Sequence, residues 1–323
     1  MSVSFSNENE LPLICTATFP GLNLSHWAGE NSDLIEKQLE KYGAILFRDF
    51  NVVNADDFAD VIEKLYKKIL PYLERSSPRN HLSRNIFTST ELTKDADIFL
   101  HNEQSYNIEF PMRTLFYCHK PPAEKGRTPI ADTRKIFQRL PTELRENFIK
   151  KKYRYTRNLG SGIGLNWQTA YQTDHKQVVA HYCRDHDIQF EWISDKVLRT
   201  HQIRDVVAKH PATQELCWFN HLTFFNMLTL PQETQTLLRN VFKDAELPNN
   251  TYYGDGSKIP DGIIEELKRA YLAEERSFAW QKSDVLLLDN MLTAHGRQSF
   301  TGDREIYAGF AEMHNWNQVK INE

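Results

Sequence analysis

The sequence has few cysteines, no long apolar run and no excess of either charge. Four cysteines occur in 323 residues, none in a C-x-x-C pair, so disulfide bonds are not expected and a reducing compartment is favoured. No segment approaches the roughly 18 apolar residues of a membrane-spanning helix, and the N-terminus lacks the basic and apolar blocks of a signal peptide. A net charge of −4 gives no general attraction to nucleic acid or anionic lipid. We therefore expect a cytoplasmic protein that binds neither nucleic acid nor membrane.

The composition is that of an ordinary globular chain, with 40% hydrophobic and 25% charged residues. No shift in composition marks a boundary, so we expect one domain over residues 1–323, and the residues predict no particular oligomeric state. Hydrophobic periodicity predicts helices over 31–42, 54–70, 141–152, 203–209, 231–242 and 262–273. Strands are predicted over 43–50, 98–106, 114–119, 278–280, 285–289 and 305–312. This mixture of α and β elements predicts a β-dominated core with flanking helices.

The segment 159–173 (LGSGIGLNWQTAYQT) is rich in glycine and aromatic residues and has neither helical nor strand periodicity. Such a stretch is typical of a mobile lid or of a long surface loop. As a lid, it would bring Trp167 and Tyr171 over a substrate. The alternative is that both aromatic side chains pack against the sheet.

A histidine and a glutamate two positions apart form the first candidate site. His101 and Glu103 lie in the predicted strand FLHNEQSY, where side chains two apart point to the same face. A second imidazole would complete the 2-His-1-carboxylate arrangement that binds Fe(II) and leaves positions open. His295, just after the apolar run 285–288, is the best candidate. An H-x-E triplet alone arises easily by chance, so the surrounding sequence must decide whether it is a metal site.

Two residues near this candidate triad have the chemistry to bind a carboxylate. Arg304 opens the strand predicted after His295, and its guanidinium could hold a carboxylate bidentately. Thr128 could add a hydroxyl donor to the same group. Arg297 is the rival to Arg304. The structural alternatives are an arginine in a surface ion pair and a threonine in a turn.

Several segments together resemble a known family. They are 77–79 (SPR), 87–91 (FTSTE), LHNEQSY, GRTPIADTR, 210–213 (HPAT), 218–220 (WFN), and DNMLTAHGR followed by Arg304. In this order they resemble the Fe(II)- and 2-oxoglutarate-dependent oxygenases of the taurine dioxygenase (TauD/TfdA) type. The resemblance is strongest to the branch that contains the syringomycin-cluster aspartate hydroxylase. It covers most of the chain.

The resemblance implies a double-stranded β-helix, the jelly roll of cupin-like proteins. It implies Fe(II) as cofactor, with His101, Glu103 and His295 as ligands, and 2-oxoglutarate and O2 as co-substrates. Arg304 would bind the distal carboxylate of 2-oxoglutarate, assisted by Thr128. The sequence departs from the family in two turns: it has Gly-Arg where two glycines usually precede the threonine, and Ser-Asp where Gly-Asp usually precedes the apolar strand. Neither departure affects the ligands.

The implied reaction couples decarboxylation of 2-oxoglutarate, giving succinate and CO2, to oxidation of an unactivated C–H bond. Halogenating relatives replace the carboxylate ligand with a small residue, so the presence of Glu103 favours hydroxylation. Desaturation, epoxidation and ring closure remain open with the same triad. A catalytically silent binding or regulatory protein of the same fold is the alternative from another class.

The resemblance further implies an amino acid or amino-acid derivative as substrate, free or tethered to a carrier protein, as in secondary metabolism. A cation is expected to bind the carboxylate of such a substrate, with Arg113, Arg184 and Arg297 as candidates. Asn220 is a further candidate for the substrate pocket.

Overall fold

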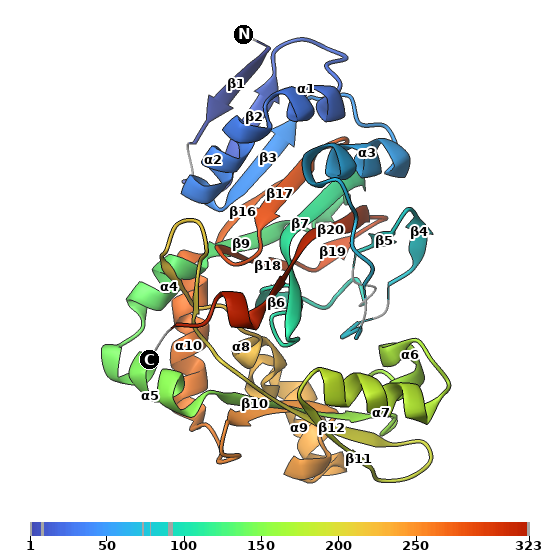
Figure 1. Cartoon of the computed structure of the whole chain (residues 1–323), viewed down its shortest axis with the longest axis vertical. Coiled ribbons are helices and arrows are strands. Elements are labelled where there is room, and N and C mark those ends of the chain that lie inside the picture. The colour runs from blue at the N-terminus through green and yellow to red at the C-terminus, as the bar shows by residue number, and fades with distance from the viewer. Residues whose placement is uncertain (1, 8–9, 73, 78, 90–92, 322–323) are drawn as a thin grey trace.

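The computed structural model describes residues 2–7, 10–72, 74–77, 79–89 and 93–321. Two sheets face each other in the upper and middle parts of the molecule (Figure 1). The larger sheet has the strand order β1 (Val3–Ser6), β2 (Leu13–Ala17), β3 (Ala44–Arg48), β17 (Val285–Asp289), β7 (Glu109–Lys120), β20 (Glu305–Asn315), β5 (Ile86–Thr88) and β4 (His81–Ser83). The smaller sheet has the order β16 (Arg276–Phe278), β9 (Thr128–Asp132), β18 (Thr293–Arg297) and β6 (Ile98–His101).

Strand β17 shows why the core strands are apolar without alternation. Leu286 and Leu288 lie in a hydrophobic cluster with Phe116 and Ile130, which belong to the two facing sheets. Val285 and Leu287 point the other way, into a second cluster that includes residues of the helices covering the larger sheet. A strand buried on both faces reads as a continuous apolar run, and the prediction of a buried strand over 285–289 is confirmed.

Three helices cover the outer face of the larger sheet: α1 (Leu24–Glu30), α2 (Ser32–Tyr42) and α3 (Ala55–Tyr66) (Figure 1). Helix α2 ends where the sequence predicted, because Gly43 has a φ of 75°, the left-handed conformation favoured by glycine after a helix. Helix α3 begins at Asn54, whose side chain accepts hydrogen bonds from the backbone N–H of Asp56 and Asp57. It ends at Tyr66, four residues before the end of the predicted segment 54–70, and the following residue Lys67 has a φ of 64°.

The lower part of the molecule is built around a third sheet with the order β11 (Ile188–Trp192), β12 (Leu198–Arg204), β10 (Tyr153–Leu159) and β15 (Asn249–Tyr253) (Figure 1). The helices that follow β9 are α4 (Thr133–Arg139), α5 (Thr142–Lys151), α6 (Trp167–Tyr171), α7 (Lys176–Asp185), α8 (Leu222–Phe225), α9 (Gln232–Val241) and α10 (Asp261–Glu274). Two short ribbons complete the strands: β13 (Ala208–Lys209) with β14 (Leu216–Cys217), and β8 (Glu124–Lys125) with β19 (Phe300–Thr301).

Three sequence predictions need correction here. The helix predicted over 203–209 is wrong, because this segment contains the end of β12 and the short strand β13. The strand predicted over 98–106 ends at His101, where the chain enters a turn in which Gln104 has a φ of 52°. Within the segment 159–173, residues Trp167–Tyr171 form the short helix α6, capped by the side chain of Asn166.

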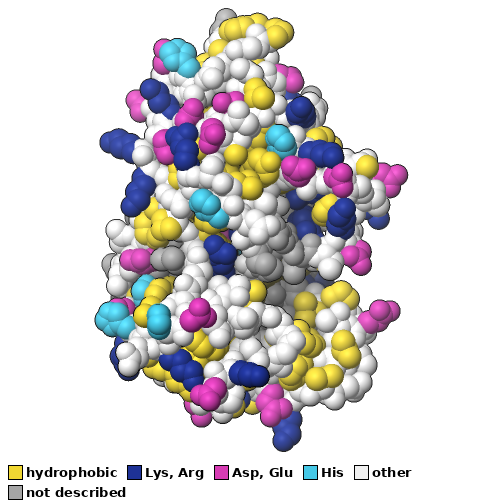
Figure 2. Space-filling view, turned by 90° about the vertical axis from the view of Figure 1, so that its right-hand side faces the viewer, with side chains coloured by type: hydrophobic (Ala, Val, Ile, Leu, Met, Phe, Trp, Pro, Cys, Tyr) yellow, Lys and Arg dark blue, Asp and Glu magenta, His cyan; other side chains and the backbone are white. Residues whose placement is uncertain are grey.

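No helix in the described part of the chain is both long and apolar enough to cross a membrane. Viewed from the right-hand side of Figure 1, the molecule has a hollow between its upper and lower parts, with Lys and Arg side chains in it (Figure 2).

Candidate metal centre and the adjoining cavity

Two histidines meet across neighbouring strands of the smaller sheet. His295 on β18 pairs directly with His101 on β6, and their ring centroids are 4.6 Å apart. Glu103 follows in the turn after β6 rather than on the strand itself. One donor atom from each of the three side chains lies within 4.8 Å of the others, and all three residues are buried. The structure therefore brings together the three residues that the sequence singled out as a metal triad.

Both imidazoles are held in a form suited to coordination. Nδ1 of His101 lies 2.9 Å from the carbonyl oxygen of Phe99, and donation to this oxygen leaves Nε2 with its lone pair. Burial lowers the pKa of His101, and burial together with the neighbouring His101 lowers that of His295 well below its usual value. Neutral imidazoles are what a metal ion requires as ligands.

The carboxylate of Glu103 is fixed on both oxygens. Arg79 Nη2 donates to Oε2 at 2.8 Å, and the hydroxyl of Tyr72 donates to Oε1 at 3.1 Å. The backbone of the turn is held by Asn290, whose Oδ1 accepts from the N–H of Glu103 at 2.7 Å and whose Nδ2 donates to its carbonyl at 2.8 Å. Partners of this kind orient metal ligands in known sites.

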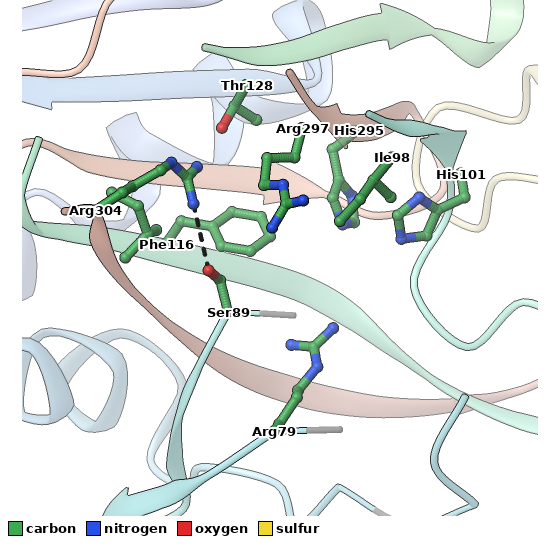
Figure 3. A pocket seen from close by; sticks show the side chains of 11 residues that line it. Arg79, Ser89, Ile98, His101, Phe116, Thr128, His295, Arg297 and Arg304 are labelled. Atoms are coloured by element: carbon green, nitrogen blue, oxygen red, sulfur yellow. Dashed lines mark hydrogen bonds between the residues drawn. The ribbon is translucent and has the colours of Figure 1, made fainter. Parts of the chain in front are cut away.

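A cavity begins at the histidines and runs between the two facing sheets, and its empty space, which includes solvent at the opening, is about 390 Å³ (Figure 3). Gly296 allows the wall to close, because a side chain there would lie 2.5 Å from the carbonyl oxygen of Ile98. The residues that line the cavity are Arg79, Ser89, Ile98, His101, Phe116, Thr128, His295, Gly296, Arg297, Arg304 and Ile306.

The end of the cavity away from His101 is formed by Arg304 and Thr128 (Figure 3). Arg304 makes long hydrogen bonds to the Gly126 carbonyl at 3.3 Å and the Ser89 hydroxyl at 3.4 Å, and no carboxylate of the described residues pairs with it. Burial and the nearby Arg297 lower the pKa of Arg304 to about 10. Arg304 is partly buried, and withdrawing a cation from water without a counterion is costly, so this end is suited to an anionic ligand.

The hydroxyl of Thr128 is also oriented to bind an anionic ligand at this end of the cavity. Its Oγ1 accepts a hydrogen bond from Trp280 Nε1 at 3.0 Å. An acceptor occupied in this way keeps its own O–H free to donate to a ligand in the cavity.

Arg297 also lines the cavity but is already engaged in the protein. Its Nη2 donates to the carbonyl oxygens of Thr93 and Ala96, both at 2.7 Å. This engagement favours Arg304 over Arg297 as the binder of a carboxylate ligand.

The other residues proposed from the sequence lie outside the lining of this cavity. Trp167 packs edge-on against Trp192 with 5.2 Å between ring centroids, so it contributes to the core of the lower part. Asn220 donates to the carbonyl of Val206 and accepts from the N–H of Leu222. Their roles as substrate contacts stay predictions, and this packing accounts for their burial without a substrate.

The two further arginines considered for a substrate carboxylate have other surroundings. Arg113 pairs with the buried Asp289 at 2.8 Å and with Glu36 at 2.7 Å. Arg184 lies on helix α7, with its guanidinium over the ring of Phe190. Neither belongs to the lining of the cavity.

Sequence reasoning missed four residues that shape the site: Arg79, Tyr72, Ser89 and Asn290. Arg79 and Ser89 lie in segments that carried the family resemblance, but no role followed from it. Asn290 is the first residue of the turn between β17 and β18, within the motif that contains His295. Their contacts with the triad and with Arg304 are tertiary and could not be read from spacing.

Comparison with known proteins defines the class. The sequence pattern of the "Taurine catabolism dioxygenase TauD, TfdA family" matches residues 8–309. The chain belongs to this family of Fe(II)- and 2-oxoglutarate-dependent oxygenases and is thus a dioxygenase. This bears out the resemblance seen in the sequence and disfavours a catalytically silent protein.

Two relatives share much of the chain. The dapdiamide synthesis protein DdaC of Enterobacter agglomerans is 37% identical over 274 residues, which cover 84% of this chain and 83% of DdaC. A clavaminate synthase-like protein of Arabidopsis thaliana is 30% identical over 288 residues, covering 86% of this chain and 84% of the relative.

Solved structures support the fold. PvcB from Pseudomonas aeruginosa has a TM-score of 0.57 at 13% identity, covering 97% of this chain and 92% of PvcB. A taurine dioxygenase from Burkholderia xenovorans has a TM-score of 0.56 at 13% identity, covering 96% of this chain and 89% of that chain. The two facing sheets are therefore the double-stranded β-helix that the resemblance implied.

Proposed function

We propose that this dioxygenase hydroxylates an unactivated C–H bond of an amino acid or amino-acid derivative, free or attached to a carrier protein. The reaction is coupled to decarboxylation of 2-oxoglutarate to succinate and CO2. The observation that carries the proposal is the buried His-Glu-His group at one end of a cavity whose other end has the unbalanced cation Arg304. The amino-acid part rests on the likeness to a protein of dapdiamide synthesis and on the resemblance of the sequence motifs.

In this proposal His101, Glu103 and His295 hold Fe(II), and Arg304 with Thr128 holds the distal carboxylate of 2-oxoglutarate. Bound together, the iron and the keto acid supply the O2 activation that C–H oxidation requires. The protein supplies position and exclusion of water. Phe224 stacks on His101 at 4.4 Å and Phe116 meets His295 edge-on at 5.1 Å, so both imidazoles are shielded by aromatic rings.

Hydroxylation is favoured over halogenation because Glu103 is present and fully held by its neighbours. A halide would need the coordination position that this carboxylate takes. Desaturation, epoxidation and cyclisation use the same triad, and product analysis distinguishes them from hydroxylation.

Anaerobic titration of the purified protein with Fe(II) and 2-oxoglutarate tests the proposal. We expect a visible metal-to-ligand charge-transfer band that needs both components. Amino acids are then screened for stimulated succinate release, and the mass of the product shows whether one oxygen atom was added. Folded protein that gives no band would contradict the proposal.

A further inference from the structure

Arg79 is a buried cation on the cavity wall, and its ion pair with Glu103 uses only one of its three nitrogen atoms. It precedes strand β4 and is 6% exposed. Its guanidinium carbon lies 4.6 Å from the ring centroid of Tyr72 and 5.3 Å from that of Phe310. Figure 3 shows it entering the cavity from the side opposite Thr128. The two rings hold the guanidinium in place at this wall.

The hydrogen bonds of Arg79 are incomplete. Nη2 donates to Glu103 Oε2 at 2.8 Å, but Nε and Nη1 are buried without a hydrogen-bond partner. Buried donors are nearly always paired in proteins, and an unpaired donor on a charged group is especially unfavourable. Because Arg79 lines the cavity, a ligand there can supply the missing acceptor. The planar fork of a guanidinium suits a carboxylate best.

The other two cavity arginines have different tasks. Arg304 is assigned to the distal carboxylate of 2-oxoglutarate, and Nη2 of Arg297 is engaged by the carbonyls of Thr93 and Ala96. Arg79 differs from both because it touches Glu103 directly. An anion on its remaining donors would therefore lie beside the candidate metal ligands, where the substrate must be held.

We propose that Arg79 binds a carboxylate of the substrate through Nη1 while Nη2 remains on Glu103. This inference rests on the proposed function, since it names the substrate contact of that same site. Arg79 thereby fixes one end of the substrate relative to Glu103 and orients the bond to be oxidised.

The assignment narrows the substrate class to molecules that keep a free carboxylate. A free amino acid satisfies this with its α-carboxylate. An amino acid bound to a carrier through its α-carbonyl satisfies it only with an acidic side chain.

The test measures binding under anaerobic conditions by calorimetry, with Fe(II) and 2-oxoglutarate present. The probes are the twenty L-amino acids and their α-amides, which lack the α-carboxylate. Asparagine and glutamine serve in the same way for aspartate and glutamate, because they lack the side-chain carboxylate. For the amino acid that binds, we expect Arg79→Gln to lower the affinity about 10- to 100-fold, as for the loss of a charged hydrogen bond. Arg79→Lys, which keeps the charge, should recover part of this loss. The matching amide should bind the wild type and Arg79→Gln equally weakly.

Tyr72→Phe is the matched control, because it removes the other hydrogen bond to Glu103 and leaves the guanidinium intact. If Arg79 only positions Glu103, then Arg79→Lys and Tyr72→Phe will weaken the Fe(II)–2-oxoglutarate band alike, with amino-acid affinity unchanged. That result overturns the inference. It is also overturned if the wild type forms the band but binds none of the amino acids.

The two proposals fail in different ways. A wild-type protein without the band contradicts the proposed function. A normal band with carboxylate binding that does not depend on Arg79 contradicts only the assignment of Arg79.

Discussion

The two ends of the cavity differ in how their charged side chains are paired within the protein. At the metal end, His101, Glu103 and the turn between them are held by partners from the protein itself, including Phe99 and Asn290. At the far end, the hydrogen bonds that Arg304 makes to the described residues are long and go to neutral oxygens, and burial lowers the pKa of Arg304. At the metal end the carboxylate of Glu103 is already paired with the cation Arg79, whereas at the far end Arg304 has no carboxylate partner among the described residues.

Under the proposed function, this difference suits one end of the cavity to a resident metal and the other end to a co-substrate that is consumed. A resident metal ion binds more tightly when the protein holds its ligands in position before the ion arrives. A co-substrate is consumed and must be replaced in each turnover. Its site is therefore best served by a protein cation, here Arg304, whose charge is balanced only when the dianion 2-oxoglutarate is bound. Substitutions at the metal end should therefore abolish Fe(II) binding. Substitutions at the far end should lower the affinity for 2-oxoglutarate and leave Fe(II) bound.

The largest effect is expected for Glu103→Ala. Loss of the carboxylate removes one of three candidate ligands, so we expect Fe(II) binding to fall and hydroxylation to be abolished. Succinate release and the anaerobic band measure both. Glu143→Ala, an exposed acid on helix α5, is the control for loss of a negative charge. Unchanged turnover in Glu103→Ala would remove this residue from the ligand set.

Arg304→Gln should come next, and it sharpens the comparison at the far end. Loss of the charged hydrogen bonds is expected to raise the KM for 2-oxoglutarate about 10- to 100-fold, with Fe(II) affinity retained. Arg297→Gln is the matched variant, and its effect should be smaller because Nη2 of Arg297 is engaged by backbone carbonyls. A larger rise of this KM in Arg297→Gln than in Arg304→Gln would mean that Arg297, and not Arg304, binds the carboxylate of 2-oxoglutarate.

Asn290→Ala tests whether the metal end depends on its supporting hydrogen bonds. Removal of the contacts to the backbone of Glu103 should lower Fe(II) affinity about tenfold, the lower end of the range for outer partners of metal ligands. Calorimetric titration with Fe(II) measures the loss, and circular dichroism verifies the fold. An unchanged Fe(II) affinity in folded protein would show that the turn is positioned by other contacts.

Thr128→Val should have the smallest effect of these changes. A neutral hydrogen bond contributes about 0.5–1.5 kcal/mol, so the KM for 2-oxoglutarate is expected to rise roughly 2- to 10-fold. The kcat should change little because the ferrous site is untouched. An increase as large as that of Arg304→Gln would mean that Thr128 is a principal contact.

The sequence predicted those features that local rules control. The buried strand over 285–289 followed from its apolar run, and the end of helix α2 followed from Gly43. The metal triad followed from the H-x-E triplet together with the motif around His295. The helix predicted over 203–209 was wrong because a short apolar run has no period that separates helix from strand.

The supporting residues could not be predicted, because their contacts connect distant parts of the chain. Arg79 and Tyr72 reach Glu103 across 24 and 31 positions, and Asn290 reaches it across 187. Which arginine is free for a ligand also depends on tertiary contacts. The family resemblance favoured Arg304 over Arg297, and the carbonyls bound to Arg297 give a physical reason for that choice.

The pairing of β18 with both β6 and β9 has a consequence for biosynthesis. During translation, His101 and Glu103 leave the ribosome long before His295, and β18 must insert between two strands already made. Until it does, the growing chain has two of the three candidate ligands and an open place in the smaller sheet. Iron is therefore expected to be captured only after β18 has been inserted between β6 and β9, when most of the residues that line the cavity have already been made.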